Sequence, residues 1–461
     1  MRRNVDMVNG SLSKNLVRFV IPMILTGVLQ LMFNACDLVV VGQFAGDRAL
    51  AAVGATGALI NLLVNAFIGL STGVNIIAAH AYGARDHEKI DKIIHTAVFL
   101  AVVCGVVVAV VGIGLSKPCL LAMNTPEDTL DLAVLYMRIY FLGAPASVLY
   151  NFCAAILRAQ GNSKHPLMFL TVAGVVNVVL NLFFVLVFHM SVLGVALATA
   201  ISQVVSAVLV VLYLKNPADP NALKFKKLKM EKAMVGQIFR LGVPASVGGM
   251  VFSFANIQVQ SAVNTFGSAA MAGCSAAANL EGFIYTAMHG VSQGALSFVG
   301  QNVGAKKLDR VPKVARVASF YAGGVGLVLG IIIYIFKTPL LSLYLSDAES
   351  MVSGYSRMNM ISMTYWICGI MEVYSYAMRG MGSSTPPTIN SMLGACGLRI
   401  LWLQTIFKLP AMHTLEGIFL TFPVSWVVTT TANFIGYKII LGKRKKEALQ
   451  LASANEKTLT E

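Results

Sequence analysis

The first long apolar run of the chain, from Arg18 to Phe44, carries an acidic residue inside it. The run reads RFVIPMILTGVLQLMFNACDLVVVGQF, and about 20 apolar residues are enough for a helix to cross a bilayer. Gln30, Asn34 and Asp37 follow one another at spacings of four and three, so a helix places them on one face. Ionisable groups in spanning helices usually face a bundle interior or a water-filled cavity. Asp37 is therefore either a capping or hydrogen-bonding residue, or a site for a coupling ion or proton.

The composition indicates an integral membrane protein. Of the 461 residues, 57% are hydrophobic and 12% are charged, and the mean hydropathy is +0.73, whereas soluble domains contain about 25% charged residues. No cleavable signal peptide is expected, because the polar residues 1–14 lead into an apolar run that is too long for one. The seven cysteines are scattered without the paired spacing of metal ligands, so we expect them to serve as packing residues.

Apolar runs bounded by charged or turn residues predict twelve membrane-spanning helices. Their approximate limits are 15–43, 50–80, 93–116, 131–157, 166–188, 192–214, 235–265, 270–300, 314–336, 354–378, 387–407 and 414–440.

The distribution of basic residues predicts the orientation of these spans. A net charge of +15 could suggest nucleic acid as a partner, but the basic residues lie in alternate short loops. Placing the N-terminus in the cytoplasm puts 28 of the 35 Lys and Arg residues on that side, leaving Arg357 among the few in outer loops. The positive-inside rule then predicts that both termini are cytoplasmic in a cell (inner or plasma) membrane. A lysine-rich linker near the middle of the chain is expected to lie close to anionic lipid headgroups.

The two halves of the chain repeat each other at an offset of 221 to 222 residues. RFVIP (18–22) matches RLGVP (240–244), and HAYGAR (80–85) matches QNVGAK (301–306). Each half contains an even number of spans, so both halves have the same orientation in the membrane. We therefore predict an all-α integral membrane protein of twelve transmembrane helices, in two six-helix bundles related by a pseudo-twofold axis along the membrane normal. Such an architecture is typical of transporters that handle substrate between the halves.

The predicted boundaries follow from this repeat. They are an amino-terminal bundle at 1–214, a cytoplasmic linker at 215–234, a carboxy-terminal bundle at 235–441 and a basic cytoplasmic tail at 442–461.

Several short motifs together resemble those of a known family. RAQG (158–161) and RGMG (379–382) place Arg at a helix end before a turn glycine, and QNVGA (301–305) is a helix-ending turn. With Asp37 followed by Gly42, and with GVALATAISQ at 194–203, the chain resembles the multidrug and toxic compound extrusion (MATE) family over essentially its whole length. The resemblance implies a secondary antiporter that exports organic, cationic or amphipathic compounds in exchange for Na⁺ or H⁺, with no enzymatic activity and no cofactor beyond the coupling ion.

The resemblance also implies a cation site in the amino-terminal half. The family uses an Asp in the first span, an Asn and an Asp one turn apart in the fifth, and a Thr in the sixth. These positions correspond to Asp37, Asn177, Asn181 and Thr199. Asn181 departs from the pattern, which often has Asp there, so we expect weaker Na⁺ binding and competition from protonation of Asp37.

The residues themselves support a shared level in the membrane. A rise of 1.5 Å per residue puts Asp37, Asn181 and Thr199 at roughly 8–12 Å from the outer ends of their spans, and Asn177 and Asn181 share a helix face. Carboxylate, amide and hydroxyl oxygens suit a hard cation such as Na⁺, and no other metal site is expected. The alternative for the two asparagines is hydrogen bonding between helices.

The carboxy-terminal half does not copy this site. Asn34 corresponds to Asn256 and Asp37 corresponds to Val259. Glu281 and Arg399 have similar estimated depths, so we expect them to form an ion pair, with a substrate-sensing acid as the alternative. Glu372 is a hypothetical cation-attracting acid. The candidate residues for the substrate cavity are Gln30, Asn34, Asn256, Gln260, Glu281, Glu372 and Arg399.

Other functions are weighed against antiport. A lipid or lipid-linked substrate flippase of the same superfamily is the alternative, but a cavity for anionic lipids would need several deep Arg or Lys, and only Arg399 is deep in a span. A membrane enzyme would need clustered acids, a metal set or a nucleophile with its base, and its usual motifs are not found. The expected partners are small organic substrates and membrane lipids, not nucleic acid, and the protein is expected to function as a monomer.

Overall fold

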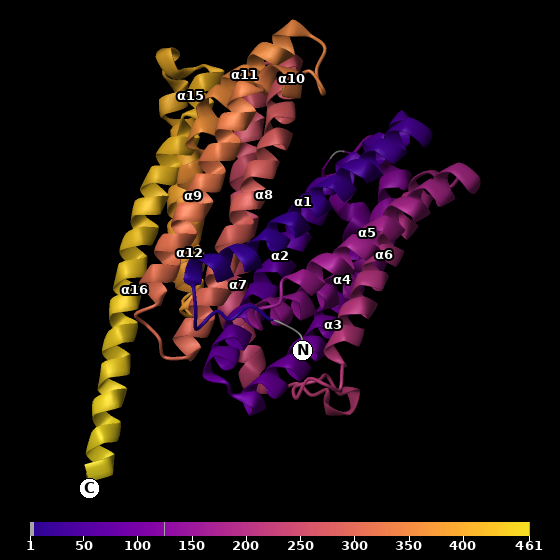
Figure 1. Ribbon diagram of the computed structural model, residues 1–461. Helices are drawn as coiled ribbons and strands as arrows, with labels where there is room; N and C mark the ends of the chain where they lie inside the picture. Colours follow the sequence, from indigo (N-terminus) through magenta and orange to yellow (C-terminus); the bar gives the residue numbers. More distant parts are fainter. Residues whose placement is uncertain (1–3, 124, 461) are drawn as a thin grey trace. The chain divides into compact units, whose positions relative to one another are not determined.

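The computed structural model describes residues 4–123 and 125–460, and within these ranges the chain is helical with no strand. Figure 1 shows the order of the elements. The α-helices are α1 (Leu12–Phe44), α2 (Asp47–Ala84), α3 (His87–Ala122), α4 (Glu127–Ala159), α5 (Lys164–Leu182), α6 (Ser191–Leu214), α7 (Lys232–Asn264), α8 (Ser268–Gly304), α9 (Val311–Ile335), α10 (Lys337–Leu341), α11 (Ala348–Ile361), α12 (Tyr365–Gly380), α13 (Thr385–Asn390), α14 (Leu398–Gln404), α15 (Leu415–Phe419) and α16 (Thr421–Thr460).

Each of the twelve predicted spans corresponds to one of these helices or to consecutive helical segments. Nine helices in the described part of the chain are long and apolar enough to cross a membrane on their own. Of the other three spans, α8 is long but rich in small residues, and the tenth and eleventh spans are interrupted. The short segments are the π-helices η1 (Phe183–Val187) and η4 (Ser391–Gly397) and the 3₁₀-helices η2 (Phe225–Lys227), η3 (Ser362–Thr364), η5 (Ile406–Lys408) and η6 (Pro410–Met412).

The surface of α3 is apolar where a soluble protein would be polar. Val103, Val106, Val107, Val110 and Val111 are between 41% and 67% exposed. Their spacing of three and four residues makes a continuous stripe along the helix. A large exposed apolar surface of this kind is a site of contact with other apolar material, which for a spanning helix is lipid.

The chain packs as two compact units, and each unit contains a segment from the other half of the sequence. Unit 1 contains Leu25–Ser246, whereas unit 2 contains Val5–Ile24 and the described residues from Val247 onward. Both exchanges occur inside a helix, two residues after Pro22 in α1 and two residues after Pro244 in α7. Proline removes a backbone hydrogen bond from a helix and favours a kink, so each exchange coincides with a weak point of its helix.

The exchanged segments pack through glycines. In unit 2, a Cβ on Gly290 of α8 would lie 3.1 Å from the backbone nitrogen of Ile24. In unit 1, a Cβ on Gly69 of α2 would lie 2.3 Å from the Cα of Ser246. Gly69 and Gly290 occupy equivalent positions of the sequence repeat, so the repeat preserves a close contact that only glycine allows at this distance.

The repeat is also present in the backbone conformation. The left-handed residues Arg85 (φ 57°) and Lys306 (φ 59°) follow the equivalent helices α2 and α8, and Gly161 (φ 90°) and Gly382 (φ 82°) follow α4 and α12. Each pair is separated by the offset of the repeat, 221 residues. The predicted helix-ending turns are therefore confirmed. In the first pair, however, Arg85 and Lys306 take the left-handed conformation, and the nearby glycines do not.

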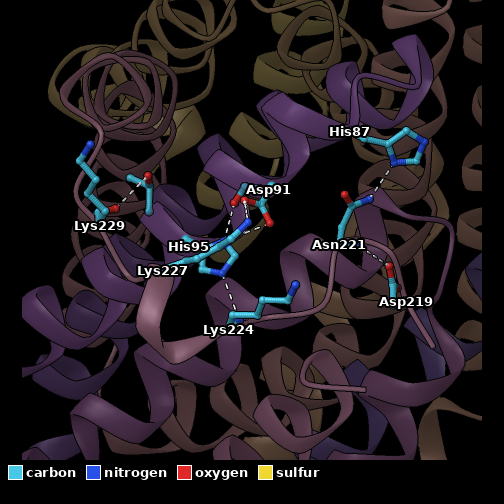
Figure 2. Close-up of polar contacts among 9 residues, drawn as sticks. His87, Asp91, His95, Asp219, Asn221, Lys224, Lys227 and Lys229 are labelled. Atoms are coloured by element: carbon cyan, nitrogen blue, oxygen red, sulfur yellow. Dashed lines mark hydrogen bonds and ion pairs between the residues drawn. The ribbon is translucent and has the colours of Figure 1, made fainter. Parts of the chain in front are cut away.

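The linker between α6 and α7 packs against the first turns of α3 (Figure 2). The backbone N–H of Lys224 donates to Nε2 of His95 at 3.0 Å, and Nδ1 of His95 lies 2.7 Å from the carbonyl oxygen of Asp91. The Lys227 ammonium group lies 3.2 Å from the Asp91 carboxylate. Because His95 is only 3% exposed, these bonds form the buried side of the linker.

Two further contacts extend this attachment along α3. Asn221 lies 3.1 Å from Nδ1 of His87, and the hydroxyl of Thr96 donates to the carbonyl oxygen of Lys229 at 3.3 Å. His87, Asp91 and His95 follow one another at intervals of four residues, so they lie on one face of α3. The linker is thus part of unit 1 and not a free tether.

The predicted basic tail begins inside a helix. α16 continues from the last span to Thr460. The Lys445 ammonium group lies 2.7 Å from the Asp309 carboxylate, and Arg444 donates to the carbonyl oxygen of Met381 at 2.9 Å. The start of the tail is therefore anchored to two turns of unit 2.

Candidate functional site

The four residues predicted for the amino-terminal site lie together in unit 1. Asn181 of α5 donates from Nδ2 to Oδ1 of Asp37 on α1 at 2.5 Å, and also to Oδ1 of Asn177 at 3.3 Å. Asn177 donates to the hydroxyl of Thr199 on α6 at 3.4 Å, and that hydroxyl donates to the carbonyl oxygen of Val195 at 3.0 Å. The result is one hydrogen-bonded chain that joins three helices at the Asp37 carboxylate.

A glycine lets α5 approach α1 at this level. A Cβ on Gly174 would lie 1.9 Å from the ring of Phe33, which precedes Asp37 by one turn. Gly174 lies one turn before Asn177 on the same face. The π-helical turn Phe183–Val187 begins two residues after Asn181. Such turns change the face on which later side chains emerge and frequently accompany functional sites.

The carboxylate of Asp37 forms no ion pair with any of the described residues. Asn177 is 5% and Asn181 0% exposed, and Oδ1 of Asn181 is buried without a hydrogen-bond donor. A carboxylate beside an unpaired amide oxygen can accept either a proton or a hard cation such as Na⁺.

Gln30 and Asn34 lie on α1 before Asp37, and their side chains are exposed. Neither takes part in the chain of hydrogen bonds that runs from Asp37 to Val195. They therefore extend a polar face of α1 and leave Asp37 as the ionisable centre. Tyr136 of α4 is an electrostatic neighbour of Asp37 that the sequence analysis missed, because nothing in its own spacing connects it with α1.

The predicted ion pair between Glu281 and Arg399 is wrong. Glu281 of α8 accepts a bidentate pair of hydrogen bonds from Arg357 of α11, with Nη2 at 2.8 Å and Nε at 3.1 Å. Arg357, which was expected in an outer loop, is 9% exposed and lies inside unit 2. α11 begins at Ala348, before the predicted tenth span, and Arg357 lies in its third turn, where its side chain reaches Glu281. The Ser350 side chain and backbone N–H hydrogen-bond to the Asp347 carboxylate at this start and lower its pKa.

Glu372 of α12 is the centre of a second polar cluster in unit 2. The hydroxyl of Tyr285 donates to Oε1 of Glu372 at 2.9 Å, and Nδ1 of His289 lies 3.2 Å from Oε2. Gln293 lies 2.8 Å from Nε2 of His289. Because the Gln293 amide can donate to Nε2, the other ring nitrogen of His289 carries the proton that faces Glu372. The Glu372 side chain is 13% exposed, so this acid is partly accessible.

Tyr285, His289 and Gln293 were missed in the sequence. They follow one another at intervals of four residues along α8, and a polar stripe of this spacing in a span is a recognisable signal.

The remaining predicted cavity residues have local partners. Gln260 donates to Asn264 at 3.0 Å on the same helix. Asn256 accepts from Nη1 of Arg399 at 3.4 Å, and Arg399 is completely buried. The structure thus brings Asn256 and Arg399 into hydrogen-bonding contact, but neither residue forms a hydrogen bond or ion pair with Glu281 or Glu372 in the described part of the chain. In the described ranges, no group of three or more His, Cys, Asp or Glu side chains is arranged to hold a metal ion.

Comparison with known proteins assigns the chain to a family. The family model MatE matches residues 22–183 and 244–403, one match in each half. "Probable multidrug resistance protein YoeA" of Bacillus subtilis (strain 168) is 31% identical over 449 residues, with 95% of each chain covered. "Multidrug export protein MepA" of Staphylococcus aureus (strain MW2) is 21% identical over 405 residues, which covers 88% of this chain and 89% of that protein.

Solved structures agree on the fold. An outward-facing multidrug resistance MATE family transporter of the MOP superfamily matches with a TM-score of 0.90 at 21% identity, covering 97% of this chain and 99% of that one. A MATE structure in the bent conformation matches with a TM-score of 0.87 at 20% identity, covering 95% and 97%. The family model matches twice, at the spacing of the repeat. One relative is similar over the full length, and the solved structures share the twelve-helix fold. The chain belongs to the multidrug and toxic compound extrusion (MATE) family of membrane transporters.

Proposed function

We propose that the protein is a secondary active antiporter that exports organic, cationic or amphipathic compounds in exchange for H⁺ or Na⁺. The names of its relatives, a multidrug resistance protein and a multidrug export protein, support drug export. One observation supports ion coupling at Asp37. Its carboxylate accepts a hydrogen bond from Asn181 and forms no ion pair with any described residue. Both termini lie on the cytoplasmic side of the cell membrane, as the distribution of Lys and Arg predicts.

In this proposal Asp37 binds the coupling ion, and the hydrogen bonds of Asn181 change when the ion binds. Asn181 now donates to Asp37 and leaves its own Oδ1 without a donor. A proton on Asp37 supplies a donor for that oxygen, and Na⁺ takes both oxygens as ligands. Either ion neutralises the carboxylate and changes the bonds that tie α1 to α5 and α6. Alternating access then follows from a difference in stability between the two states.

Glu372 serves a different step in this proposal. Its carboxylate is partly accessible and lies among Tyr285, His289 and Tyr376, whose ring centroid is 5.4 Å from that of His289. An acid surrounded by aromatic rings attracts organic cations through charge and cation–π contacts. We therefore assign Glu372 to substrate attraction and Asp37 to ion coupling.

The decisive experiment measures efflux of a cationic dye from proteoliposomes under separately imposed Na⁺ and H⁺ gradients. Wild type is compared with Asp37→Asn, which keeps the shape of the side chain and removes its charge. We expect one gradient to drive wild-type efflux and Asp37→Asn to remove that dependence while dye still binds. The driving gradient identifies the coupling ion.

Asp131→Asn is the matched control, because Asp131 is an exposed acid of α4. It should transport like wild type. Full coupling in Asp37→Asn would refute the role of Asp37, and the same experiment with Glu372→Gln would then test the other acid.

A further inference from the structure

Arg399 is a buried cation with no counter-ion among the residues that the structure describes. It lies on α14 directly after the π-helical segment Ser391–Gly397 and is 0% exposed. Its Nε donates to the hydroxyl of Ser425 at 3.1 Å, and its Nη1 donates to Asn256 at 3.4 Å. Its Nη2 is buried without an acceptor, and across the described residues no carboxylate lies within ion-pair distance of it. A buried guanidinium in this condition is expensive, because desolvation of an ion costs several kcal/mol.

Neutral groups surround the guanidinium. Its carbon lies 4.1 Å from the ring centroid of Phe422, 5.6 Å from that of Phe252 and 6.0 Å from that of Trp426. Aromatic faces attract a cation, but each contact is weak compared with an ion pair. The rings therefore reduce the cost of burying Arg399 without neutralising its charge.

The acids of unit 2 that could neutralise it have other partners. Glu281 is held by both Nε and Nη2 of Arg357. Glu372 accepts from Tyr285 and faces His289. The other groups with electrostatic influence on Arg399 are Cys368, Cys396 and Tyr365, which are neutral when protonated, and Arg357, which is itself a cation.

A second buried donor near Arg399 also has no acceptor. Nε1 of Trp426 is buried and unpartnered, and the residue is 2% exposed. The hydroxyl of Thr421, one turn before Ser425 on α16, is likewise buried without a partner. Nη2 of Arg399 and Nε1 of Trp426 are thus buried donors without an acceptor, and no carboxylate in the described part of the chain pairs with the guanidinium. An excess of donors around a positive charge is the arrangement that binds an anion.

We propose that the carboxy-terminal bundle binds a small monovalent anion of chloride type at Nη2 of Arg399, with the Trp426 indole N–H as a second donor. The aromatic walls favour a weakly hydrated monovalent ion over a strongly hydrated divalent one. The anion neutralises the guanidinium and lets it remain in the bundle. The proposal is independent of the ion coupling assigned to Asp37.

The repeat makes the contrast between the two bundles clear. Asn256, which contacts Arg399, occupies the position equivalent to Asn34, three residues before the Asp37 equivalent Val259. The amino-terminal bundle therefore places a half-buried negative charge near this level of its first helix. The carboxy-terminal bundle places a buried positive charge near the matching residue. One suits a cation or a proton and the other suits an anion.

The test is the thermal unfolding of the full-length protein in detergent, in sodium chloride and in sodium gluconate at equal ionic strength. The Na⁺ concentration is the same in both, so binding at Asp37 does not contribute to the difference. We expect the Tm of wild type to be higher in chloride by roughly 2–4 °C. Arg399→Gln should remove the difference, and Asp37→Asn should retain it. Equal Tm values for wild type in the two salts, or an unchanged difference in Arg399→Gln, would overturn the proposal.

If the Arg399→Gln protein does not fold, two further measurements test the anion site. Trp426→Phe keeps an aromatic ring and removes the N–H, so it should raise the half-maximal chloride concentration by about tenfold, because the anion loses one hydrogen bond. Crystals grown in sodium bromide should show an anomalous peak within hydrogen-bonding distance of Nη2 of Arg399. The absence of that peak would mean that water and the aromatic rings alone hold the guanidinium.

Discussion

Single side chains decide what the amino-terminal site can bind. Asp37 supplies the only formal charge of the hydrogen-bonded chain, and Asn177, Asn181 and Thr199 supply neutral oxygens. In the antiport that we propose, a site with one negative charge is expected to favour a proton over Na⁺. We expect Asn181 to set this balance, because it is 0% exposed and directly contacts the carboxylate.

Asn181→Asp adds a second carboxylate and should move the site toward Na⁺. Two acids in hydrogen-bonding distance repel each other unless a cation or a proton lies between them. We expect the half-maximal Na⁺ concentration for Na⁺-dependent efflux or thermal stabilisation to fall by at least about tenfold. Titration of proteoliposomes with NaCl, with choline chloride as the control salt, measures it. An unchanged Na⁺ dependence would show that Asn181 does not contact the bound ion.

Glu281 and Arg357 should behave as a structural pair. Glu281→Met leaves the Arg357 guanidinium buried and unpaired, and we expect a loss of about 3–5 kcal/mol in the free energy of unfolding. Replacing both residues with Met removes both charges and should recover most of that loss. Denaturation of the purified variants in detergent, analysed as a double-mutant cycle, gives the coupling energy. Additive losses would contradict a direct pair.

At the scale of the elements, the linker between α6 and α7 is not a free loop, because it is attached to α3. The residues between α6 and α7 are tied to one face of α3 through His87, Asp91 and His95. Its lysines extend outward from this attachment, since Lys224, Lys226 and Lys229 are exposed. The same segment therefore continues unit 1 on one side and presents positive charge on the other.

His95→Phe should release the linker from α3. The substitution keeps an aromatic ring in a buried position and removes the acceptor for the Lys224 N–H, which costs about 1–3 kcal/mol when the donor stays buried. Hydrogen–deuterium exchange of residues 222–231 should become faster, while exchange in α4 stays unchanged. The matched control is His87→Phe, which removes only the contact to Asn221. Equal exchange in all three proteins would show that His95 does not hold the linker.

For the molecule as a whole, the exchange of helix segments means that neither half of the sequence contains a complete bundle. Residues Val5–Ile24 pack in unit 2, where Leu16 and Phe19 join an apolar cluster with Phe298. Nδ2 of Asn302 donates to the carbonyl oxygen of Met7 at 3.0 Å in the same unit. Each unit is therefore completed by a helix segment from the other half of the chain.

A fragment that begins at Lys232 should not be stable alone. It lacks Val5–Ile24, so the side chains around Phe298 lose their partners and the Asn302 amide loses an acceptor. We expect the fragment to be degraded or to aggregate, and co-expression with residues 1–231 to restore a monodisperse complex. Size-exclusion chromatography and protease resistance measure both outcomes. A stable isolated fragment would contradict the importance of the exchanged segment.

The sequence alone determines the features that depend on one helix at a time. Span length follows from apolar runs, and the turns at Arg85, Gly161, Lys306 and Gly382 follow from local motifs that recur at one offset. These two properties are set by covalent spacing and by the bilayer thickness. The grouping of Asp37, Asn177, Asn181 and Thr199 was expected from the family resemblance and from similar depths, and the hydrogen bonds between the three helices confirm it.

Only the tertiary structure decides which side chains meet across helices. Glu281 pairs with Arg357 and not with Arg399, although the estimated depths favoured Arg399. A depth estimate gives the position along a helix but not its rotation, and the π-helical segment before Arg399 changes that rotation. The exchange of segments at Pro22 and Pro244 likewise depends on how helices pack. Contacts between helices are decided by rotation and close packing, which a linear pattern does not encode.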